Sequence, residues 1–461
     1  MNTTAVFGHA PSGDDPIAAW HALVRQNADA NLCAGLAARM RAGHLTFGGR
    51  LLCPFLRPFF LAPADEARVA RAAEALWRLG ERLSEAAAAD DALMRAMGLS
   101  DAEIALARID PRYGVASTAG RADAFLLPDS LEFAEYNAES PAGPGYSQRL
   151  SELFDREPMM QRFRERFEVR HYTPIPQLLE ALLTSYRDWG GTRTPPRIAI
   201  VDWREVPTWS EFELLRSAFG EAGVPTEICD PRDLVFDGRT LFASGVAVDL
   251  VYRRVLINDI VARPDECRAL VDAYRQGAVC MANTLRCKIA HKKAFFAVLT
   301  DERYRHLFPA RDLEEVAGHV PWTRLVRDES TTRDGHAVDL PEYLRRHRDR
   351  FVLKPNDEYG GTGVTLGWET DERVWDEAIA RALVESERGW VAQERIRIRR
   401  ETFPICEDTG IVERDMLVDF APYLFRGRLA GFLTRLSATG LANVTSGGGQ
   451  VPAFIVEPRG R

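Results

Sequence analysis

The sequence predicts a mixed architecture, α/β in the middle of the chain and α+β towards the C-terminus, behind a mainly helical N-terminal region. Residues 15–41 and 64–106 are rich in Ala, Leu, Arg and Glu, with apolar residues recurring every three or four positions, which is typical of amphipathic helices. Between residues 197 and 254, apolar runs alternate with a helical stretch, which indicates a layer with a largely parallel sheet. Strand-like runs dominate from residue 351 onwards.

Within the first 190 residues, extended segments interrupt the helical pattern. The run LTFGGRLLCPFLRPFFL, dense in Gly, Pro and Phe, favours a buried loop or short strands. Residues 121–137 are expected to form two short strands with a tight connection at Asp129 and Ser130. Helices are expected at about 148–167 and 175–189, before a proline-containing break, GGTRTPP, that is a candidate subdomain boundary.

The later elements are expected from short apolar runs. RIAIVDW and VDLVYRR are predicted strands on either side of a helix at about 209–222. Towards the C-terminus the predicted strands are FVLKP, GWVAQERI, MLVDFAPYLF, LAGFLTRL and VPAFIV, with one helix at about 372–387. No repeat at a fixed period is present in the sequence.

Bulk properties exclude several classes of protein. The chain of 461 residues is long enough for two or three subdomains, and its net charge of −8, with bases and acids interspersed, provides no footprint for nucleic acid. No basic and apolar leader pattern and no run of eighteen apolar residues is present, so we expect a cytoplasmic protein that does not enter membranes. Seven cysteines, never spaced as CxxC, argue against a disulfide framework or structural zinc and favour mostly buried, reduced thiols.

The segment FVLKPNDEYGGTGVTLGW has the composition of a phosphate clamp. Lys354 lies on a predicted strand, and Gly360, Gly361 and Gly363 follow in a loop. Glycines let backbone N–H groups approach phosphate oxygens, and a strand-mounted lysine adds a point charge. The segment is not a Walker A loop, because no Gly-Lys-Ser/Thr follows. An ordinary glycine-rich hairpin with an exposed lysine is the alternative.

The segment GRADAFLLPDSLEFAEYNAESPAG has the composition of a cation site. Arg121 and Asp123 share one face of the first strand, and Glu135 and Asn137 share one face of the second. Carboxylate and amide oxygens that converge from paired strands suit Mg²⁺ held jointly with nucleotide phosphates. The alternative is a solvated acidic face.

Together the two segments resemble the ATP-grasp superfamily, and more narrowly its circularly permuted members and the glutathionylspermidine synthase synthetase domain. In that superfamily an R-x-D strand precedes an E-x-N strand by about a dozen residues. The resemblance implies that Asp123, Glu135 and Asn137 hold Mg²⁺ and that Arg121 stabilises charge on an acyl phosphate. The metal strands here precede the lysine segments, whereas familiar members have the opposite order, so the implied fold is an ATP-grasp fold in circularly permuted order.

The resemblance also implies a nucleotide site. The run NTLRCKIAHKKAFFAVLTDE matches the element with the first ATP lysine, best at Lys293 with Lys292 and Lys288 as alternatives, and Lys354 matches the second. GWVAQERI resembles the adenine hinge, which points to Gln393 and Glu394 with a register open by one or two residues. The late R…N-x-x-x-GG element matches at three places, which are Arg435 for the phosphate or acyl group, Asn443 for the nucleotide, and Gly447 to Gly449 as a turn near substrate.

The implied activity is an ATP-dependent carboxylate–amine ligase that forms an amide through an acyl phosphate. ATP and Mg²⁺ are the implied cofactors, and the implied partners are a small-molecule carboxylate and amine. An ATP-grasp phosphotransferase or a nucleotide-binding protein without turnover are the alternatives, and the oligomeric state stays open. In the α/β layer, which resembles a pre-ATP-grasp domain, substrate candidates are Asp202, Arg204, Arg253 and Arg254, with one of the last two alternatively paired to Asp249. The expected parts are a mainly helical region at 1–114, magnesium-binding strands and following helices at 115–190, a pre-ATP-grasp substrate domain at 191–285, and an ATP-binding part at 286–461.

Overall fold

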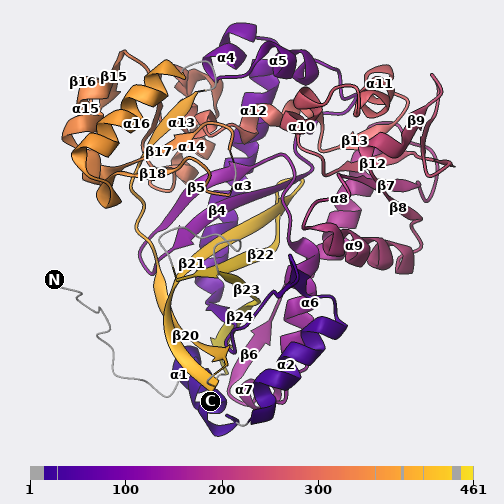
Figure 1. Ribbon diagram of the computed structural model, residues 1–461, viewed down its shortest axis with the longest axis vertical. Helices are drawn as coiled ribbons and strands as arrows, with labels where there is room; N and C mark the ends of the chain where they lie inside the picture. The colour runs from indigo at the N-terminus through magenta and orange to yellow at the C-terminus, as the bar shows by residue number, and fades with distance from the viewer. Residues whose placement is uncertain are drawn as a thin grey trace.

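Strands from distant parts of the chain meet in a six-stranded sheet at the centre of the molecule (Figure 1). The structure is a computed structural model that describes residues 15–28, 30–358, 360–385, 389–408, 410–438 and 448–459. The sheet has the order β23-β22-β21-β4-β5, and β20 also pairs with β21. Its strands are β4 (Ala119–Leu126), β5 (Leu131–Asn137), β20 (Arg400–Glu407), β21 (Gly410–Phe425), β22 (Arg428–Ser437) and β23 (Gly449–Val451).

The N-terminal region is mainly helical, as predicted, but its two long helical patterns are divided. Asp90 caps a new helix by accepting from the backbone of Leu93, and Ser100 and Glu103 form a capping box that starts another. The long helix α3 packs its apolar side against β21 and β22. The helices are α1 (Pro16–Gln26), α2 (Ala30–Ala42), α3 (Pro63–Ala88), α4 (Asp91–Ala96) and α5 (Asp101–Ala107).

The predicted helix at about 148–167 is two helices and the start of a strand. Pro158 begins the second helix, because it has no N–H to continue the first and restricts Glu157 to an extended conformation. A three-stranded sheet, in the order β3-β24-β6, then joins an N-terminal, a central and a C-terminal segment. The elements here are β1 (Thr46–Phe47), β2 (Arg50–Leu51), β3 (Phe59–Leu61), α6 (Pro144–Asp155), α7 (Pro158–Arg164), β6 (Phe167–Arg170) and β24 (Ala453–Pro458).

The predicted α/β layer is confirmed as a four-stranded parallel sheet in the order β13-β12-β7-β8. All four residues of β7 and of β12 are buried, as expected for strands covered on both faces. The elements of this layer are α8 (Pro174–Asp188), β7 (Ile198–Val201), α9 (Trp209–Glu221), β8 (Thr226–Cys229), β9 (Leu234–Phe236), β10 (Leu241–Ala243), β11 (Val246–Ala247), β12 (Leu250–Arg253), α10 (Ile257–Ala262), α11 (Arg268–Gln276) and β13 (Cys280–Ala282).

A four-stranded antiparallel sheet in the order β14-β19-β17-β18 lies beside β4 and β5 (Figure 1). The predicted strands FVLKP and GWVAQERI are its β17 and β19, and α16 covers it with α15. The elements here are α12 (Lys288–His291), α13 (Ala294–Leu299), α14 (Ala310–Val316), β14 (Thr323–Leu325), β15 (Ser330–Arg333), β16 (His336–Asp339), α15 (Leu340–Arg346), β17 (Phe351–Pro355), β18 (Thr365–Leu366), α16 (Glu372–Val384) and β19 (Trp390–Glu394).

One pair of cysteines departs from the expectation of reduced thiols. Cys33 on α2 and Cys406 on β20 form a disulfide across 373 residues of sequence, a proximity that spacing along the chain does not reveal. Cys53, Cys229, Cys267, Cys280 and Cys287 are free and buried, as predicted. Burial raises the pKa of the Cys287 thiol to about 12. Among the described helices, none has the length and apolar character needed to cross a membrane.

Candidate active site

A pocket between the central sheet and the β14-β19-β17-β18 sheet brings together most of the predicted site residues. Asp123 and Arg435, 312 residues apart in sequence, lie in contact in its wall. Lys293 enters from the turn before α13. The residues that line the pocket are Asp123, Phe125, Ala134, Glu135, Lys293, Val352, Lys354, Pro355, Glu358, Gly360, Gly361, Thr362, Val364, Leu366, Trp368, Gln393, Ile396, Ile398, Asp419 and Arg435.

Two lysines point into this pocket from different elements. Lys354, on β17, donates from Nζ to Oε1 of Gln393 at 2.6 Å and to the carbonyl of Ala134 at 3.3 Å. Lys293 donates from Nζ to the carbonyl of Glu358 at 2.6 Å and lies 3.3 Å from Oε2 of Glu135. The pKa of Lys354 is lowered to about 8, mainly by burial and also by the charge of Lys293, with Glu135 opposing the shift. Two lysine side chains therefore line the same pocket, an arrangement that suits an anionic ligand.

The alternative lysines do not line this pocket. Lys288 and Lys292 are almost fully buried, with 1% and 3% of their side chains exposed, and both bind the carboxylate of Asp357. The geometry therefore favours Lys293 among the three candidates.

Arginines and aspartates alternate on the central sheet where it borders the pocket, and Asp123, Asp419 and Arg435 line the wall there. Arg121 donates from Nε to Oδ1 of Asp123 at 2.7 Å, and Arg435 donates from Nη2 to Oδ2 of the same carboxylate at 2.6 Å. Burial opposes ionisation of Asp123, but the two arginines outweigh it and hold the pKa of its carboxyl well below the usual range. Arg121 does not itself line the pocket and acts on it through Asp123.

Asp419 also lines the pocket, although no sequence motif pointed to it. It lies opposite Arg435 in the β21–β22 pair and accepts from Nε of Arg435 at 2.6 Å. Within the part of the chain that the structure describes, its buried Oδ1 has no hydrogen-bond partner, and burial raises the pKa of its carboxyl to about 7. A usable signal was present in the sequence, because an acid within the apolar run MLVDFAPYLF needs a partner or a ligand if that strand is buried.

The predicted metal ligands lie on one antiparallel pair. Asp123 lies opposite Glu135, and Asn137 donates from Nδ2 to Oε1 of Glu135 at 3.2 Å. Burial opposes ionisation of Glu135, but Lys293 and Lys354 outweigh it and lower the pKa of its carboxyl. Among the described residues, no three Asp, Glu, His or Cys side chains are arranged to hold a metal by themselves. Oxygen donors of this kind fit Mg²⁺ that takes its other ligands from phosphate.

The predicted adenine hinge is divided between two faces of β19. Gln393 is buried and lines the pocket. Glu394 does not line it and instead forms ion pairs with Arg333 at 3.0 Å and Arg350 at 2.8 Å, because consecutive strand residues point to opposite sides. Ile396 lines the pocket two residues further on. The hinge side of the pocket therefore offers Gln393 and an apolar surface.

The predicted glycines lie in three environments. Gly360 and Gly361 line the pocket. Gly363 has a positive φ of 74°, and a Cβ there would lie 2.7 Å from Pro355, so it serves close packing of the loop on β17. Asn443 and Gly447 lie outside the described residues. At Gly449 a Cβ would approach Phe55 to 2.8 Å, so this glycine packs against the protein interior.

The four substrate candidates of the α/β layer lie outside the pocket. Neither Arg253 nor Arg254 pairs with Asp249, whose ion pair is with Arg193 at 3.0 Å. Arg253 is fully buried against Glu139, and Arg254 donates to the carbonyl of Pro141 at 2.6 Å. Arg204 pairs with Asp233 at the surface, and burial raises the pKa of Asp202 to about 6.

Comparison with known proteins agrees with this architecture. A family model for circularly permuted ATP-grasp type 2 proteins matches residues 128–437. A protein of Frankia casuarinae named "Putative glutamate–cysteine ligase 2-2" is 24% identical over 297 residues, which cover 61% of this chain and 32% of that relative. An uncharacterised protein of Synechocystis sp. is 26% identical over 356 residues, 72% of this chain and 66% of that one. This chain thus spans about a third of the Frankia relative.

A solved structure has the same fold along nearly the whole chain. The glutathione synthetase-like effector from Globodera pallida, in its apo form, superposes with a TM-score of 0.60 at 12% identity, covering 96% of this chain and 98% of that one. The family match spans more than half of the chain, and the strand order of the central sheet has the permuted connection that the motifs imply. The chain therefore belongs to the circularly permuted ATP-grasp type 2 family.

Proposed function

We propose that this chain is an ATP-dependent ligase that joins a carboxylate to an amine through an acyl phosphate and releases ADP and phosphate. Family membership supports the general statement of an ATP-dependent ligase. The observation that carries the more specific proposal is the convergence of Lys293, Lys354, Arg435 and the Asp123–Glu135 pair on one pocket. Preorganised cations beside hard oxygen ligands suit phosphoryl transfer, in which positioning and electrostatics do most of the catalytic work.

The parts of the nucleotide are assigned to different pocket residues. Lys293 and Lys354 are assigned to the phosphates, together with Gly360 and Gly361, which line the same pocket. Gln393 and Ile396 are assigned to the adenine, because an amide and an apolar side chain suit a purine ring. The glycine-rich loop is assigned the exclusion of water, which would hydrolyse an acyl phosphate.

Arg435 and the bound metal are assigned to the charge that develops on the substrates. Mg²⁺, held by Asp123, Glu135 and Asn137 together with phosphate oxygens, would supply charge neutralisation at the phosphates. Asp419 holds Arg435 independently of Asp123, so Arg435 keeps its place in the wall whichever partner Asp123 takes. Arg435 is assigned to the transferring phosphoryl or acyl group, and Arg121, which does not line the pocket, is assigned to holding Asp123 in place.

The substrates are proposed by class. The name of the Frankia relative directs the first tests to amino acids, with glutamate as the acid and cysteine as the amine. Because this chain spans only about a third of that relative, other amino acids, peptides and polyamines belong in the same test.

The experiment measures Mg²⁺-dependent ADP release and hydroxamate formation, with candidate acids in pools and hydroxylamine as the trapping amine. We expect hydroxamate with the wild-type protein and a rate lower by about a hundredfold or more in Lys354→Ala and Glu135→Ala, because each removes preorganised charge from the transition state. The control is Glu401→Gln. Glu401 is a buried carboxylate on β20 that accepts from Arg57 and Arg399 and does not line the pocket.

Two outcomes would contradict the ligase proposal. Release of AMP would exclude transfer of the γ-phosphoryl group to the acid. A stable phosphorylated product without hydroxamate would favour a phosphotransferase instead. Equal losses in the Glu401→Gln control would mean that the pocket variants act through stability rather than through chemistry.

A further inference from the structure

All the lysines of this chain lie in one region. Only four of its 59 basic Lys and Arg side chains are lysines. Lys293 and Lys354 line the proposed nucleotide pocket, whereas Lys288 and Lys292 are buried behind it and bind Asp357. Arginine is the basic residue at all the other Lys and Arg positions in the chain. We therefore infer that positions 288 and 292 need a compact ammonium group with three donor directions.

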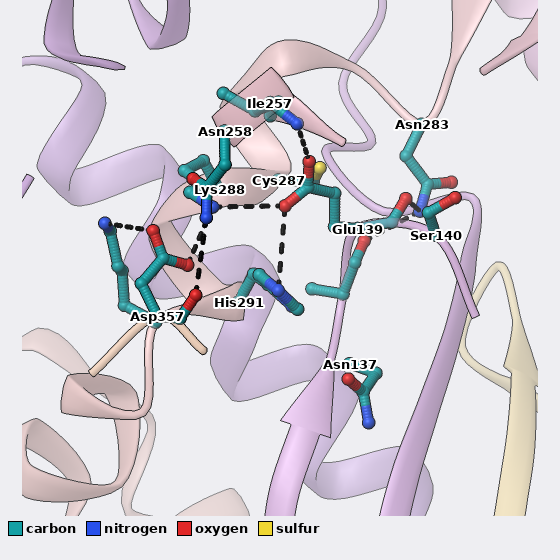
Figure 2. Close-up of polar contacts among 12 residues, drawn as sticks. Asn137, Glu139, Ser140, Ile257, Asn258, Asn283, Cys287, Lys288, His291 and Asp357 are labelled. Carbon is teal, nitrogen blue, oxygen red and sulfur yellow. Dashed lines mark hydrogen bonds and ion pairs between the residues drawn. The ribbon is translucent and has the colours of Figure 1, made fainter. Parts of the chain in front are cut away.

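The buried lysines belong to a network of ion pairs, which Figure 2 shows around Lys288. Lys288 donates from Nζ to Oδ1 of Asp357 at 2.7 Å and to Oε2 of Glu139 at 3.3 Å. Lys292 donates from Nζ to Oδ2 of Asp357 at 2.6 Å and to Oε1 of Glu103 at 2.8 Å. Each oxygen of the Asp357 carboxylate therefore has its own lysine.

The network is balanced in charge. Glu139 also accepts from Nη1 of Arg253 at 3.3 Å and from the backbone N–H of Ile257. With Arg253 included, three carboxylates face three cations, and burial lowers the pKa of the neighbouring His291 to about 4, so the imidazole adds no charge near neutral pH. Balance of this kind avoids the cost of an unpaired buried charge.

Asp357 is attached to the beginning of the glycine-rich loop. Asn356, the residue before it, is fully buried, accepts at Oδ1 from the backbone of Ala294 at 2.8 Å and donates from Nδ2 to the carbonyl of Met97 at 2.8 Å. Its own carbonyl accepts from the backbone N–H of Lys293 at 2.9 Å. Residues 356–358, the loop root, are thus tied to the backbone that carries Lys293, and Lys354 lies two residues before them.

We propose that Asp357 is a positioning residue, which fixes the loop root through Lys288 and Lys292 and thereby holds Lys293 and Lys354 at the spacing that the nucleotide phosphates require. The proposal rests on the proposed function, because it assigns the pocket to a nucleotide. Without Asp357 the loop root populates other positions. The apparent dissociation constant for the nucleotide then equals the intrinsic constant divided by the fraction of molecules whose loop root is in the binding position.

The experiment compares nucleotide affinity with stability. The dissociation constant of Mg·ADP is measured by calorimetry, and the melting temperature is measured for the same proteins. Asp357→Asn is expected to lower the melting temperature and to raise the dissociation constant of Mg·ADP by about tenfold. This is the change expected when one molecule in ten has its loop root in the binding position. The double variant Asp357→Asn/Lys292→Met restores the charge balance of the network, so its melting temperature should recover while its affinity stays low.

The control is Glu401→Gln, which also removes a buried carboxylate with one cation on each oxygen, Arg57 and Arg399. It should lower the melting temperature and leave the dissociation constant of Mg·ADP unchanged. If affinity recovers with stability in the double variant, or if Glu401→Gln weakens Mg·ADP as much as Asp357→Asn does, the network is only structural and the proposal is wrong. If the wild-type protein does not bind Mg·ADP, the proposed function itself is wrong, and this assignment falls with it.

Discussion

Lys354 is buried enough to lose its proton within an accessible pH range. Its pKa is about 8, lowered mainly by burial, with Glu135 opposing that effect and Lys293 adding to it. Below this value the ammonium is present in the free protein, and above it the amine is neutral. A neutral amine attracts a phosphate far less than an ammonium does.

Affinity for Mg·ADP should therefore be greatest below pH 8 and should fall as the pH rises through that value. Well above pH 8 the dissociation constant of Mg·ADP should rise by about tenfold per pH unit, as expected when only the protein with protonated Lys354 binds. Lys354→Arg keeps its charge above pH 8 and should lack this fall. Calorimetric titrations at several pH values on both sides of 8 measure it, and identical profiles for the two proteins would assign the effect to another group.

At the scale of single elements, the β4–β5 pair holds the predicted metal ligands in register. Tyr136 lies between Glu135 and Asn137 on β5, and its ring packs against Gly120 and Gly80. A Cβ at position 120 would lie 2.6 Å from Oη of Tyr136, closer than atoms can pack. The strand that carries Glu135 and Asn137, two of the predicted metal ligands, thus depends on a glycine in its neighbour.

Gly120→Ala should shift Tyr136 and cost ~1–3 kcal/mol of unfolding free energy, as overpacking does. Activity in the hydroxamate assay should fall with it, because Glu135 and Asn137 flank the displaced ring. Gly114→Ala is the control, since a Cβ there would meet no atom of the described residues within 4 Å. Urea denaturation compares the two variants, and equal midpoints would show that β5 accommodates the methyl group without cost.

At the scale of the whole molecule, the fold depends on contacts between distant segments. Arg121 on β4 lies opposite Tyr423 on β21, and the disulfide between Cys33 and Cys406 joins α2 to β20. Cross-links that close long loops stabilise mainly by restricting the unfolded chain.

Cys33→Ser should lower the free energy of unfolding by ~2–4 kcal/mol, the usual range for loss of a disulfide. A reducing agent should lower the denaturation midpoint of the wild-type protein to about that of Cys33→Ser. The same agent should not change the midpoint of Cys33→Ser itself. If reduction destabilises both proteins equally, the effect does not come from this disulfide.

The sequence by itself was sufficient for the local features. The strands that carry Asp123, Glu135 and Lys354, the parallel layer around β7 and β12, and the permuted motif order were all predictable, because hydrophobic periodicity and motif spacing are properties of short segments. Element boundaries were less predictable. The single helix expected at about 148–167 is divided, because Pro158 cannot continue α6 and begins α7 instead.

Only the tertiary structure decided which charged groups share an environment. Asp419 meets Arg435 because β21 pairs with β22, and Glu394 turns away from the pocket because strand alternation gives that face to Gln393. The sequence already favoured Lys293, and the structure disfavours the alternatives Lys288 and Lys292, because both are buried against Asp357. Burial and pairing depend on residues hundreds of positions apart, and local periodicity contains no information about those partners.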